Sequence, residues 1–285
     1  MALFDLRQIL GPDDAVPSLP TIFHHLDAAV NNPRTSMRQV AEIISTDQSL
    51  SARLLKLVNS AFFGFPSRIE TITHAVTIVG IQQLRDLALA TSIIQMFRGI
   101  PIVLLDPKAF WTHSIACGVA ARILAAYHQE PNVERFFVAG LLHDIGHLIL
   151  YRHKAEEAKE ALLRCIEGGR ILYQVEREVM GTDHAEIGGE MLAFWKLPPS
   201  LTEAVRCHHV PSRAGRYPLE SSVIHLGDLI ANALQMGTSG ERHVPPLEPL
   251  AWDGLRLSIS ILSPAILQLE RQVSDAVAQF LEDGR

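Results

Sequence analysis

Histidine and aspartate side chains recur along the chain at positions that helices could bring to one point. The sequence contains 13 histidines. The residues of chemical interest, in chain order, are His113, His143, Asp144, His184, His208, His209 and Asp228. Imidazole and carboxylate ligands together suit divalent transition metals such as iron, manganese, nickel or zinc, and the three widely separated cysteines disfavour a thiolate site. The series therefore predicts a metal centre with nitrogen and oxygen ligands.

Local geometry allows adjacent residues of this series to share a centre. Neighbouring residues on a helix point about 100° apart, so His143 and Asp144 could occupy different coordination positions. The two oxygens of Asp144 could then bridge two ions. Pro211 disfavours helical geometry in the residue before it, so we expect the helix to unwind near His208 and His209 and both rings to turn inward.

The remaining histidines are predicted to be structural or solvated, because an isolated histidine is more often a hydrogen-bonded structural residue than a ligand. The pair His24-His25 has no partner set. The same interpretation applies to His74, His128, His153, His225 and His243. Asp228 differs, because its neighbours Leu226 and Leu229 indicate a buried face, and a buried carboxylate needs a partner.

The elements that must position these residues are predicted to be helices. Apolar residues recur at helical spacing throughout, and no segment shows the sustained two-residue alternation of a strand, so the fold class is all-α. Ser36 and Gln39 have the form of a capping box, and Asp47 can cap the next helix. An apolar stripe over 72–79 predicts another helix, followed by a longer one over 81–97.

A connector at residues 99–107 separates two expected lobes. Asp106-Pro107 opens a new helix with a cap and a first-turn proline. We therefore divide the chain into an N-terminal helical lobe, residues 1–100, and a metal-binding helical lobe with a C-terminal helix, residues 101–285. Further segments expected from the pattern are helices over 107–127, 133–151, 154–167, 170–180, 184–196, 199–209, 221–236 and 263–282, with a surface loop at 237–249.

Composition narrows the function classes. The chain has 285 residues, of which 48% are hydrophobic and 20% charged, as in ordinary globular proteins. The formal net charge of −6 gives no general attraction to nucleic acid or anionic lipid. Its apolar stretches fall short of the roughly 20 residues that span a bilayer, Asp5 and Arg7 interrupt any signal peptide, and the cysteine usage suits a reducing compartment. We expect a cytoplasmic protein with no nucleic-acid and no membrane partner.

The helix pair over residues 36–59 has the form of a DNA-binding helix-turn-helix. Between residues 36 and 98, however, six basic residues stand against four acidic residues, and the small surplus is spread over many turns. Tight contact with a phosphate backbone requires denser positive charge. We therefore expect the N-terminal lobe to dock on the second lobe and not to bind DNA independently.

Several segments resemble known families. Residues 137–146, Phe-Val-Ala-Gly-Leu-Leu-His-Asp-Ile-Gly, resemble the signature of the HD superfamily of metal-dependent phosphohydrolases. Leu19-Pro20 and residues 47–55, 58–61 and 75–80 resemble the N-terminal pattern of the HDOD family. The likeness covers roughly residues 15–235. It implies a two-lobed helical HDOD fold with a C-terminal HD-domain helical bundle. HDOD proteins are signalling or regulatory modules, and many have lost the HD ligands that this chain retains.

Similarity to the related HD-GYP phosphodiesterases implies how the ligands divide between two ions. One ion would be held by His113, His143, Asp144 and Asp228, and Asp144 would bridge to a second ion held by His184, His208 and His209. We expect two divalent transition-metal ions, with iron, manganese or nickel favoured over zinc. Asp144 and His147 are the candidate catalytic residues.

Three single positions and one short element depart from the HD-GYP pattern. His147 stands where those proteins carry a lysine associated with the phosphate, and Val210 stands where they carry glutamate. Residues 216–218, Arg-Tyr-Pro, match only part of the Gly-Tyr-Pro element, and Ala109 replaces a glutamate that supplies a third metal in some members. Two ions are therefore the expected maximum. The role of His147 stays open among an extra ligand, a proton donor and a polar residue beside the site.

Two functions follow from the sequence. The first is a metal-dependent phosphohydrolase acting on a phosphodiester or nucleotide, which the complete ligand set favours. The second is a catalytically silent regulatory or scaffold module that binds a signalling partner or a nucleotide. The replaced lysine and glutamate favour this second function, as does the habit of the HDOD family.

Overall fold

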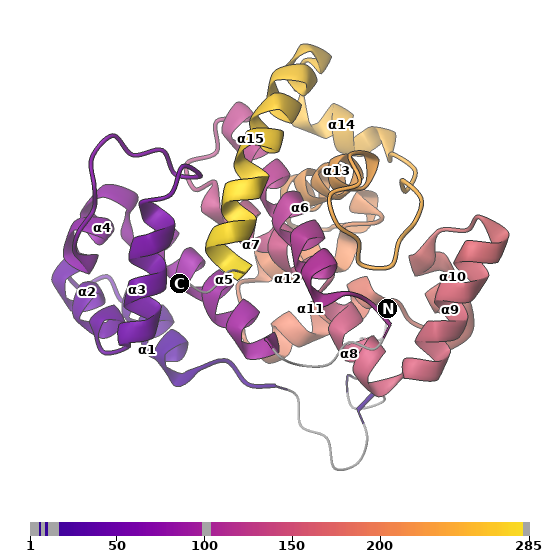
Figure 1. Ribbon diagram of the computed structural model, residues 1–285, viewed down its shortest axis with the longest axis horizontal. Helices are drawn as coiled ribbons and strands as arrows, with labels where there is room; N and C mark the ends of the chain where they lie inside the picture. The colour runs from indigo at the N-terminus through magenta and orange to yellow at the C-terminus, as the bar shows by residue number, and fades with distance from the viewer. Residues whose placement is uncertain (1–5, 7–8, 11–16, 99–103, 282–285) are drawn as a thin grey trace.

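The structure is a computed structural model that describes residue 6 and residues 9–10, 17–98 and 104–281. The described residues form helices and contain no strand, so the predicted all-α class is confirmed. Helices near the two ends of the chain lie beside each other, because α15 (Leu262–Leu281) packs along α6 (Pro107–Tyr127) and also contacts helices of the N-terminal region. Figure 1 shows α15 in yellow, between the N-terminal helices on the left and the central helices.

The N-terminal region consists of short helices that pack against one longer helix. The predicted caps are present, since the Ser36 side chain forms a capping box with Gln39 and the Asp47 carboxylate accepts a hydrogen bond from the backbone N–H of Leu50. The first helix of this region was not predicted, because its N-cap residue, Pro20, makes no side-chain capping bond. The elements are α1 (Thr21–Val30), α2 (Met37–Ser45), α3 (Gln48–Val58), α4 (Ile72–Val79) and α5 (Ile81–Phe97).

Helix α6 is the central helix of the molecule. The Asp106 carboxylate accepts hydrogen bonds from the backbone N–H groups of Lys108 and Ala109, and Pro107 occupies the first turn, as the sequence predicts. The helix is long and apolar enough to cross a membrane, but 78% of its apolar window is buried inside the protein. It packs against α7 (Glu134–Leu142), α13 (Pro218–Ala233) and α15, which is the environment of a core helix.

One predicted helix, over residues 133–151, is wrong, because the structure breaks it at His143 and Asp144 into α7 and α8 (Ile145–His153). Asp144 leaves helical geometry with φ −98° and ψ 8°. Gly146 then approaches α11 (His184–Phe194) so closely that an added Cβ would lie 2.0 Å from the carbonyl oxygen of His184. The contact turns the Asp144 side chain toward α11 and depends on tertiary packing, which helical periodicity does not report.

The other helices of the second lobe follow the expected order with shifted ends. Helix α13 begins at Pro218, three residues before the predicted start, because proline suits a first helical turn. Residues 237–248 form the expected loop, but the short helix α14 was not predicted. The remaining elements are α9 (Ala155–Gly168), α10 (Leu172–Met180), α12 (Pro199–Cys207) and α14 (Pro249–Leu255).

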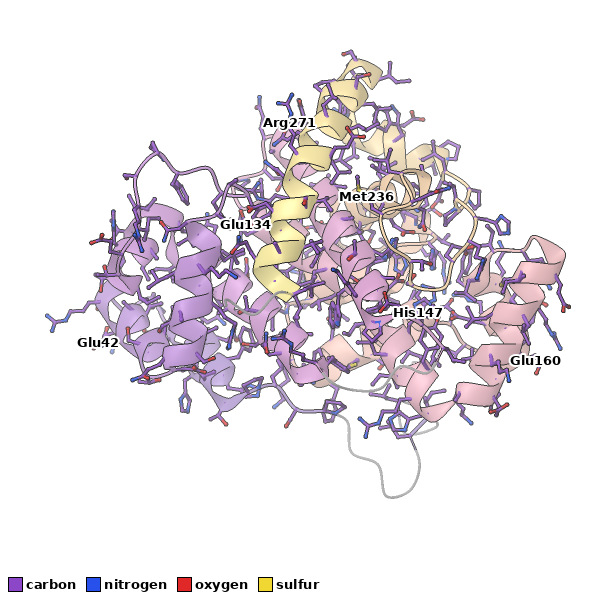
Figure 2. All side chains as sticks on the ribbon, in the orientation of Figure 1. Glu42, Glu134, His147, Glu160, Met236 and Arg271 are labelled. Atoms are coloured by element: carbon purple, nitrogen blue, oxygen red, sulfur yellow. The ribbon has the colours of Figure 1, made fainter. Side chains whose placement is uncertain are left out.

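One hydrophobic core runs through both parts of the molecule. It includes Leu54 of α3, Leu87 of α5, Phe137 of α7 and Phe280 of α15, all of them buried. Helices α9 and α10 lie at one end of the molecule and carry a small core of their own around Ala161 and Val175. In Figure 2, Glu42 and Glu160 lie at opposite ends, and His147 lies between the α9–α10 pair and the central helices.

Candidate metal centre

The structure brings all seven predicted ligands together from five segments of the chain. They come from the middle of α6, the α7–α8 junction, the start of α11, the residues after α12, and the middle of α13. His113, His143 and His208 are fully buried, and His209 is the one member of the seven that is partly exposed. The candidate groups whose ligand atoms lie within 4.8 Å of one another include His113, His143 and Asp228, and separately His184, His208 and His209.

Asp144 lies between these two groups, and its two oxygens face different histidines. Oδ2 lies 3.1 Å from His143 Nε2 and 3.5 Å from His113 Nε2. Oδ1 lies 3.1 Å from His184 Nε2 and 4.0 Å from His208 Nε2. This position is available because Asp144 stands in the break between α7 and α8 and not within a helix. The two oxygens of Asp144 are therefore divided between the two groups of histidines.

The first group has its ligand atoms held from behind by backbone and amide groups. His143 Nδ1 lies 2.7 Å from the carbonyl oxygen of Gly140, so it donates its proton there and leaves the Nε2 lone pair facing the centre. Asp228 Oδ1 lies 3.2 Å from His113 Nε2 and 3.4 Å from His143 Nε2. Asn232, one turn further along α13, donates to the same oxygen at 2.7 Å.

The ligand atoms of the second group are also held from behind by hydrogen bonds. His208 Nδ1 lies 2.7 Å from the carbonyl oxygen of Val205, which leaves Nε2 as the inward lone pair. His184 Nδ1 lies 2.6 Å from Glu176 Oε2, and its Nε2 lies 2.8 Å from His209 Nε2. The ring of Tyr173 stacks on His209 with centroids 4.2 Å apart and planes at 13°. Tyr173 therefore lies against the partly exposed His209.

A cation fits this arrangement better than hydrogen bonding does. Within the described part of the chain, His143 Nε2, His208 Nε2 and both ring nitrogens of His113 are buried without a hydrogen-bond partner. Buried polar atoms are rarely left in this state, because each unsatisfied group costs about 1–3 kcal/mol. Here the unpaired atoms converge on carboxylate oxygens, and imidazole nitrogen with carboxylate oxygen is a donor set for divalent transition metals.

The charges of the cluster favour the ligand forms of its carboxylates. Burial raises the pKa of Asp144, but His143 and His147 outweigh it and hold that pKa well below its ordinary value. Burial likewise raises the pKa of Asp228, but the close contacts with His113 and His143 outweigh it and hold that pKa well below its ordinary value. Both aspartates are therefore ionised at neutral pH.

The pKa values of the histidines shift in different directions. Burial, with the neighbouring charges of His143 and His184, lowers the pKa of His208 to about 3, so this ring is neutral, as a metal ligand must be. Burial lowers the pKa of His184 as well, but the Glu176 and Asp144 carboxylates outweigh burial and raise that pKa well above its ordinary value. The pattern places positive charge at His184 when no cation is present.

Glu176 was not predicted, although it touches two members of the cluster. Its side chain is 1% exposed, and besides His184 it lies 3.0 Å from His147 through Oε1. Burial raises its pKa, but His184 and His147 hold that pKa at about 2. The sequence contained a signal, because Glu176 follows Leu172 by four residues on the apolar face of a predicted helix, and an acidic residue on such a face needs a partner.

His225 was predicted to be structural or solvated, and the structure shows it buried with structural contacts. Its Nδ1 lies 2.8 Å from the carbonyl oxygen of His208, and its Nε2 accepts a hydrogen bond from the backbone N–H of Glu248 at 3.0 Å. It therefore anchors the residues after α12 to the loop before α14. Cys207 is buried beside His208, and burial raises the pKa of its thiol to about 11, which suits a packing residue.

Residues 216–218, the partial Gly-Tyr-Pro element, lie on a loop fixed by a single carboxylate. Glu203 of α12 accepts hydrogen bonds from the backbone N–H groups of Gly215, Arg216 and Tyr217. The loop therefore has a defined conformation. None of these contacts involves a cluster residue.

Comparison with known proteins supports the fold and the family. The model of the HDOD domain family matches residues 16–211, which is more than half of the chain. An HDOD domain protein of unknown function from Geobacter sulfurreducens superposes with a TM-score of 0.79 at 22% identity, covering 95% of this chain and 96% of that one. A protein from Shewanella amazonensis SB2B, provisionally named a phosphohydrolase, gives a TM-score of 0.76 at 25% identity, covering 96% and 97%.

The chain is also similar in sequence to part of a longer curated protein. An uncharacterised protein of Treponema pallidum (strain Nichols) is 29% identical over 222 residues, which is 74% of this chain. The match spans 41% of that relative's length. The chain thus corresponds to less than half of this relative.

Proposed function

This chain belongs to the HDOD family, and we propose that it is a metal-dependent phosphohydrolase acting on a phosphodiester or a nucleotide in the cytoplasm. The observation that carries the proposal is Asp144, whose Oδ2 and Oδ1 each lie 3.1 Å from a histidine of a different group. The Shewanella amazonensis protein, similar over nearly the whole chain, supports the same class through its provisional name.

The residues present fit two divalent transition-metal ions, with iron, manganese or nickel favoured over zinc. The first ion would be held by His113, His143, Asp144 and Asp228, and the second by Asp144, His184, His208 and His209. When bound, such a pair supplies an activated water and neutralises charge on a phosphate.

Each protein residue then has a defined task in the proposal. Asp144 and His147 are the proposed catalytic residues, since Asp144 contacts both ion positions and His147 Nδ1 lies 3.6 Å from Asp144 Oδ1. Asn232 holds Asp228, and Glu176 holds His184, so the ligand atoms are in place before an ion binds. The partly exposed His209, beside Tyr173, marks the side from which a substrate would approach.

A second candidate is a regulatory module that holds metal and binds a signalling partner or nucleotide without turnover. It is favoured by the deep burial of the ligands, because His113, His143 and His208 are 0% exposed. It is also favoured by His147 and Val210, which replace the lysine and glutamate of HD-GYP phosphodiesterases.

The test combines elemental analysis of the purified protein with a phosphodiester hydrolysis screen. We expect bound transition metal, weak hydrolysis of bis(p-nitrophenyl) phosphate with added manganese or iron, and little or no cleavage of cyclic di-GMP. The Asp144→Ala variant is the control and should be inactive. Metal-loaded protein that hydrolyses no phosphoester would leave the regulatory module as the function, and robust cleavage of cyclic di-GMP would contradict the expected weak and generic activity.

A further inference from the structure

His147 occupies a fixed position in the first turn of α8, next to the second group of ligands. Its side chain is 1% exposed. Its ring stacks on His184, with centroids 3.8 Å apart and planes at 23°, and also on Tyr151, with centroids 5.1 Å apart and planes at 14°. The Tyr151 hydroxyl is itself fixed by donation to the carbonyl oxygen of Ser239 at 2.7 Å. His147 therefore has one orientation and cannot rotate to solvent.

A single buried carboxylate selects which nitrogen of two imidazoles carries the proton. Glu176 Oε1 lies 3.0 Å from His147 Nε2, and Oε2 lies 2.6 Å from His184 Nδ1. Oε2 also accepts from the backbone N–H of His184 at 3.0 Å, which fixes the carboxylate in place. Because a carboxylate accepts hydrogen bonds, His184 presents its Nδ1–H to Glu176. The close approach of Oε1 to His147 Nε2 favours the proton on that nitrogen of the second ring. Their opposite nitrogens, His147 Nδ1 and His184 Nε2, carry the lone pairs.

These two lone pairs face the same carboxylate oxygen. His184 Nε2 lies 3.1 Å and His147 Nδ1 lies 3.6 Å from Asp144 Oδ1. Among the described residues, neither ring nitrogen of His147 has a hydrogen-bond partner. The lone pairs of His184 Nε2, His147 Nδ1 and Asp144 Oδ1 repel one another unless a cation lies between these three atoms. Ligand atoms about 2.0–2.2 Å from one metal ion are separated from each other by about 3 Å or more, which these distances match.

A hydrogen bond to Asp144 is the alternative to a ligand, and the geometry argues against it. His147 Nδ1 lies 3.6 Å from Asp144 Oδ1, which is too long for a hydrogen bond. Coordination of an ion through Nδ1 uses this unpaired buried atom.

We propose that His147 is a further ligand, through Nδ1, of the second ion, and that Glu176 is the positioning residue that holds His147 and His184 for it. This inference rests on the proposed metal centre. It gives the second position one more imidazole than the HD-GYP resemblance implies. Imidazole ligands suit iron and nickel better than magnesium or calcium, so His147 would bias the second position toward such metals.

The test is titration of the metal-free protein with Co²⁺ against a competing chelator, following cobalt absorption. Wild type should bind two ions, and His147→Ala should bind the second at least about tenfold more weakly while keeping the first. The control is His153→Ala, a histidine at the other end of α8, which should match wild type. Added imidazole should restore the cobalt spectrum of His147→Ala, which a purely structural role of the ring would not allow.

Two further variants test whether His147 acts as a metal ligand or only as a positive charge. His147→Lys supplies a cation without a free lone pair at neutral pH, so it should bind the second ion as weakly as His147→Ala. Glu176→Gln should weaken binding of the second ion by about 10–100-fold. Glu178→Gln, at an exposed position of the same helix, should leave both affinities unchanged.

Two results would overturn the inference. One is wild-type affinity for the second ion in His147→Lys, and the other is equal affinities in His147→Ala and His153→Ala. If wild type itself binds no metal, the proposed function fails and not this inference alone, so the two failures are distinguishable. Circular dichroism of each metal-free variant checks that the fold is retained.

Discussion

Two buried polar networks lie at opposite ends of α7, and they differ in what balances their carboxylates. At the start of α7, the Glu134 carboxylate lies 2.8 Å from the guanidinium of Arg122. Nearby, Asp86 of α5 lies 2.6 Å from Arg85 and accepts a hydrogen bond from Asn132 at 3.0 Å. At the end of α7, about 13 Å along a nine-residue helix, the carboxylates of the metal centre face histidines instead.

We interpret the difference as that between a structural network and the proposed metal site. A guanidinium carries its own permanent charge, so the network at the start of α7 needs no added ion. Histidine is neutral when it acts as a ligand, so the metal centre has inward lone pairs and two ionised aspartates without a fixed cation of that kind. The pKa values of the carboxylates also differ between the two networks. Burial raises the pKa of Glu134 despite Arg122, while the histidines lower the pKa of Asp144.

The largest expected effect comes from removing the bridging carboxylate. Asp144→Ala should lose metal at both positions and all hydrolysis, because both oxygens of Asp144 face ligand groups. His184→Ala should mainly empty the second position. Elemental analysis of the two variants beside wild type measures this. Equal metal content in all three proteins would show that the histidines and aspartates are only a structural remnant.

Removing the arginine from the network at the start of α7 should lower the stability of the protein and leave its metal content unchanged. Arg122→Ala leaves Glu134 buried with 4% of its side chain exposed and without its guanidinium partner. Breaking a buried pair in this way costs about 3–5 kcal/mol of unfolding free energy. Urea unfolding measures the loss, and elemental analysis should find wild-type metal in the folded variant. A variant that loses metal as readily as Asp144→Ala would contradict the separation of the two networks.

The sequence predicted the ligand set better than the backbone that positions it. Helix α6 was predicted at its observed ends because Asp106 and Pro107 are local signals that need no tertiary contact. The break at Asp144 was missed because it depends on the close approach of Gly146 to α11, and apolar periodicity continues across it.

Residues that act through another residue were the least predictable part of the site. Glu176 lies eight residues before His184, and its role depends on how α10 and α11 meet. Asn232 could have been found, because it follows Asp228 by four residues on one helix and so lies on the same face. The division into lobes at residue 100 and the metal assignment stay predictions.

Chelation should destabilise the protein through the metal centre alone. A ligand at 100 times its dissociation constant stabilises the folded state by about 2.7 kcal/mol, so removing metal should lower Tm by roughly 5–10 °C in a chain of this size. Differential scanning fluorimetry with and without chelator measures the shift. Arg122→Ala should keep the full shift and Asp144→Ala should show none. A chelator shift in Asp144→Ala equal to that of wild type would place the stabilising ion elsewhere.

The smallest expected effect is a pH dependence of opposite sign in the two networks. Burial raises the pKa of Glu134, the Arg122 charge lowers it, and Asp86 adds to the raise, so the folded protein holds this proton more tightly than the unfolded chain. Its contribution to stability is therefore fully present below the unfolded pKa of about 4.3 and is lost as pH rises through the folded pKa. Asp144 and Asp228, whose pKa values are lowered, contribute stability that is lost as pH falls.

Glu134→Gln isolates the first of these contributions, because glutamine does not titrate and the metal centre is unchanged. The unfolding free energy of wild type minus that of Glu134→Gln should fall by about 1.4 kcal/mol for each unit by which the folded pKa is raised, as pH increases from 4 to 8. Urea unfolding at steps of pH, with metal-free protein for both chains, measures the difference. A difference that rises with pH would mean that Arg122 holds Glu134 ionised more strongly than burial opposes it, and the two networks would then titrate alike.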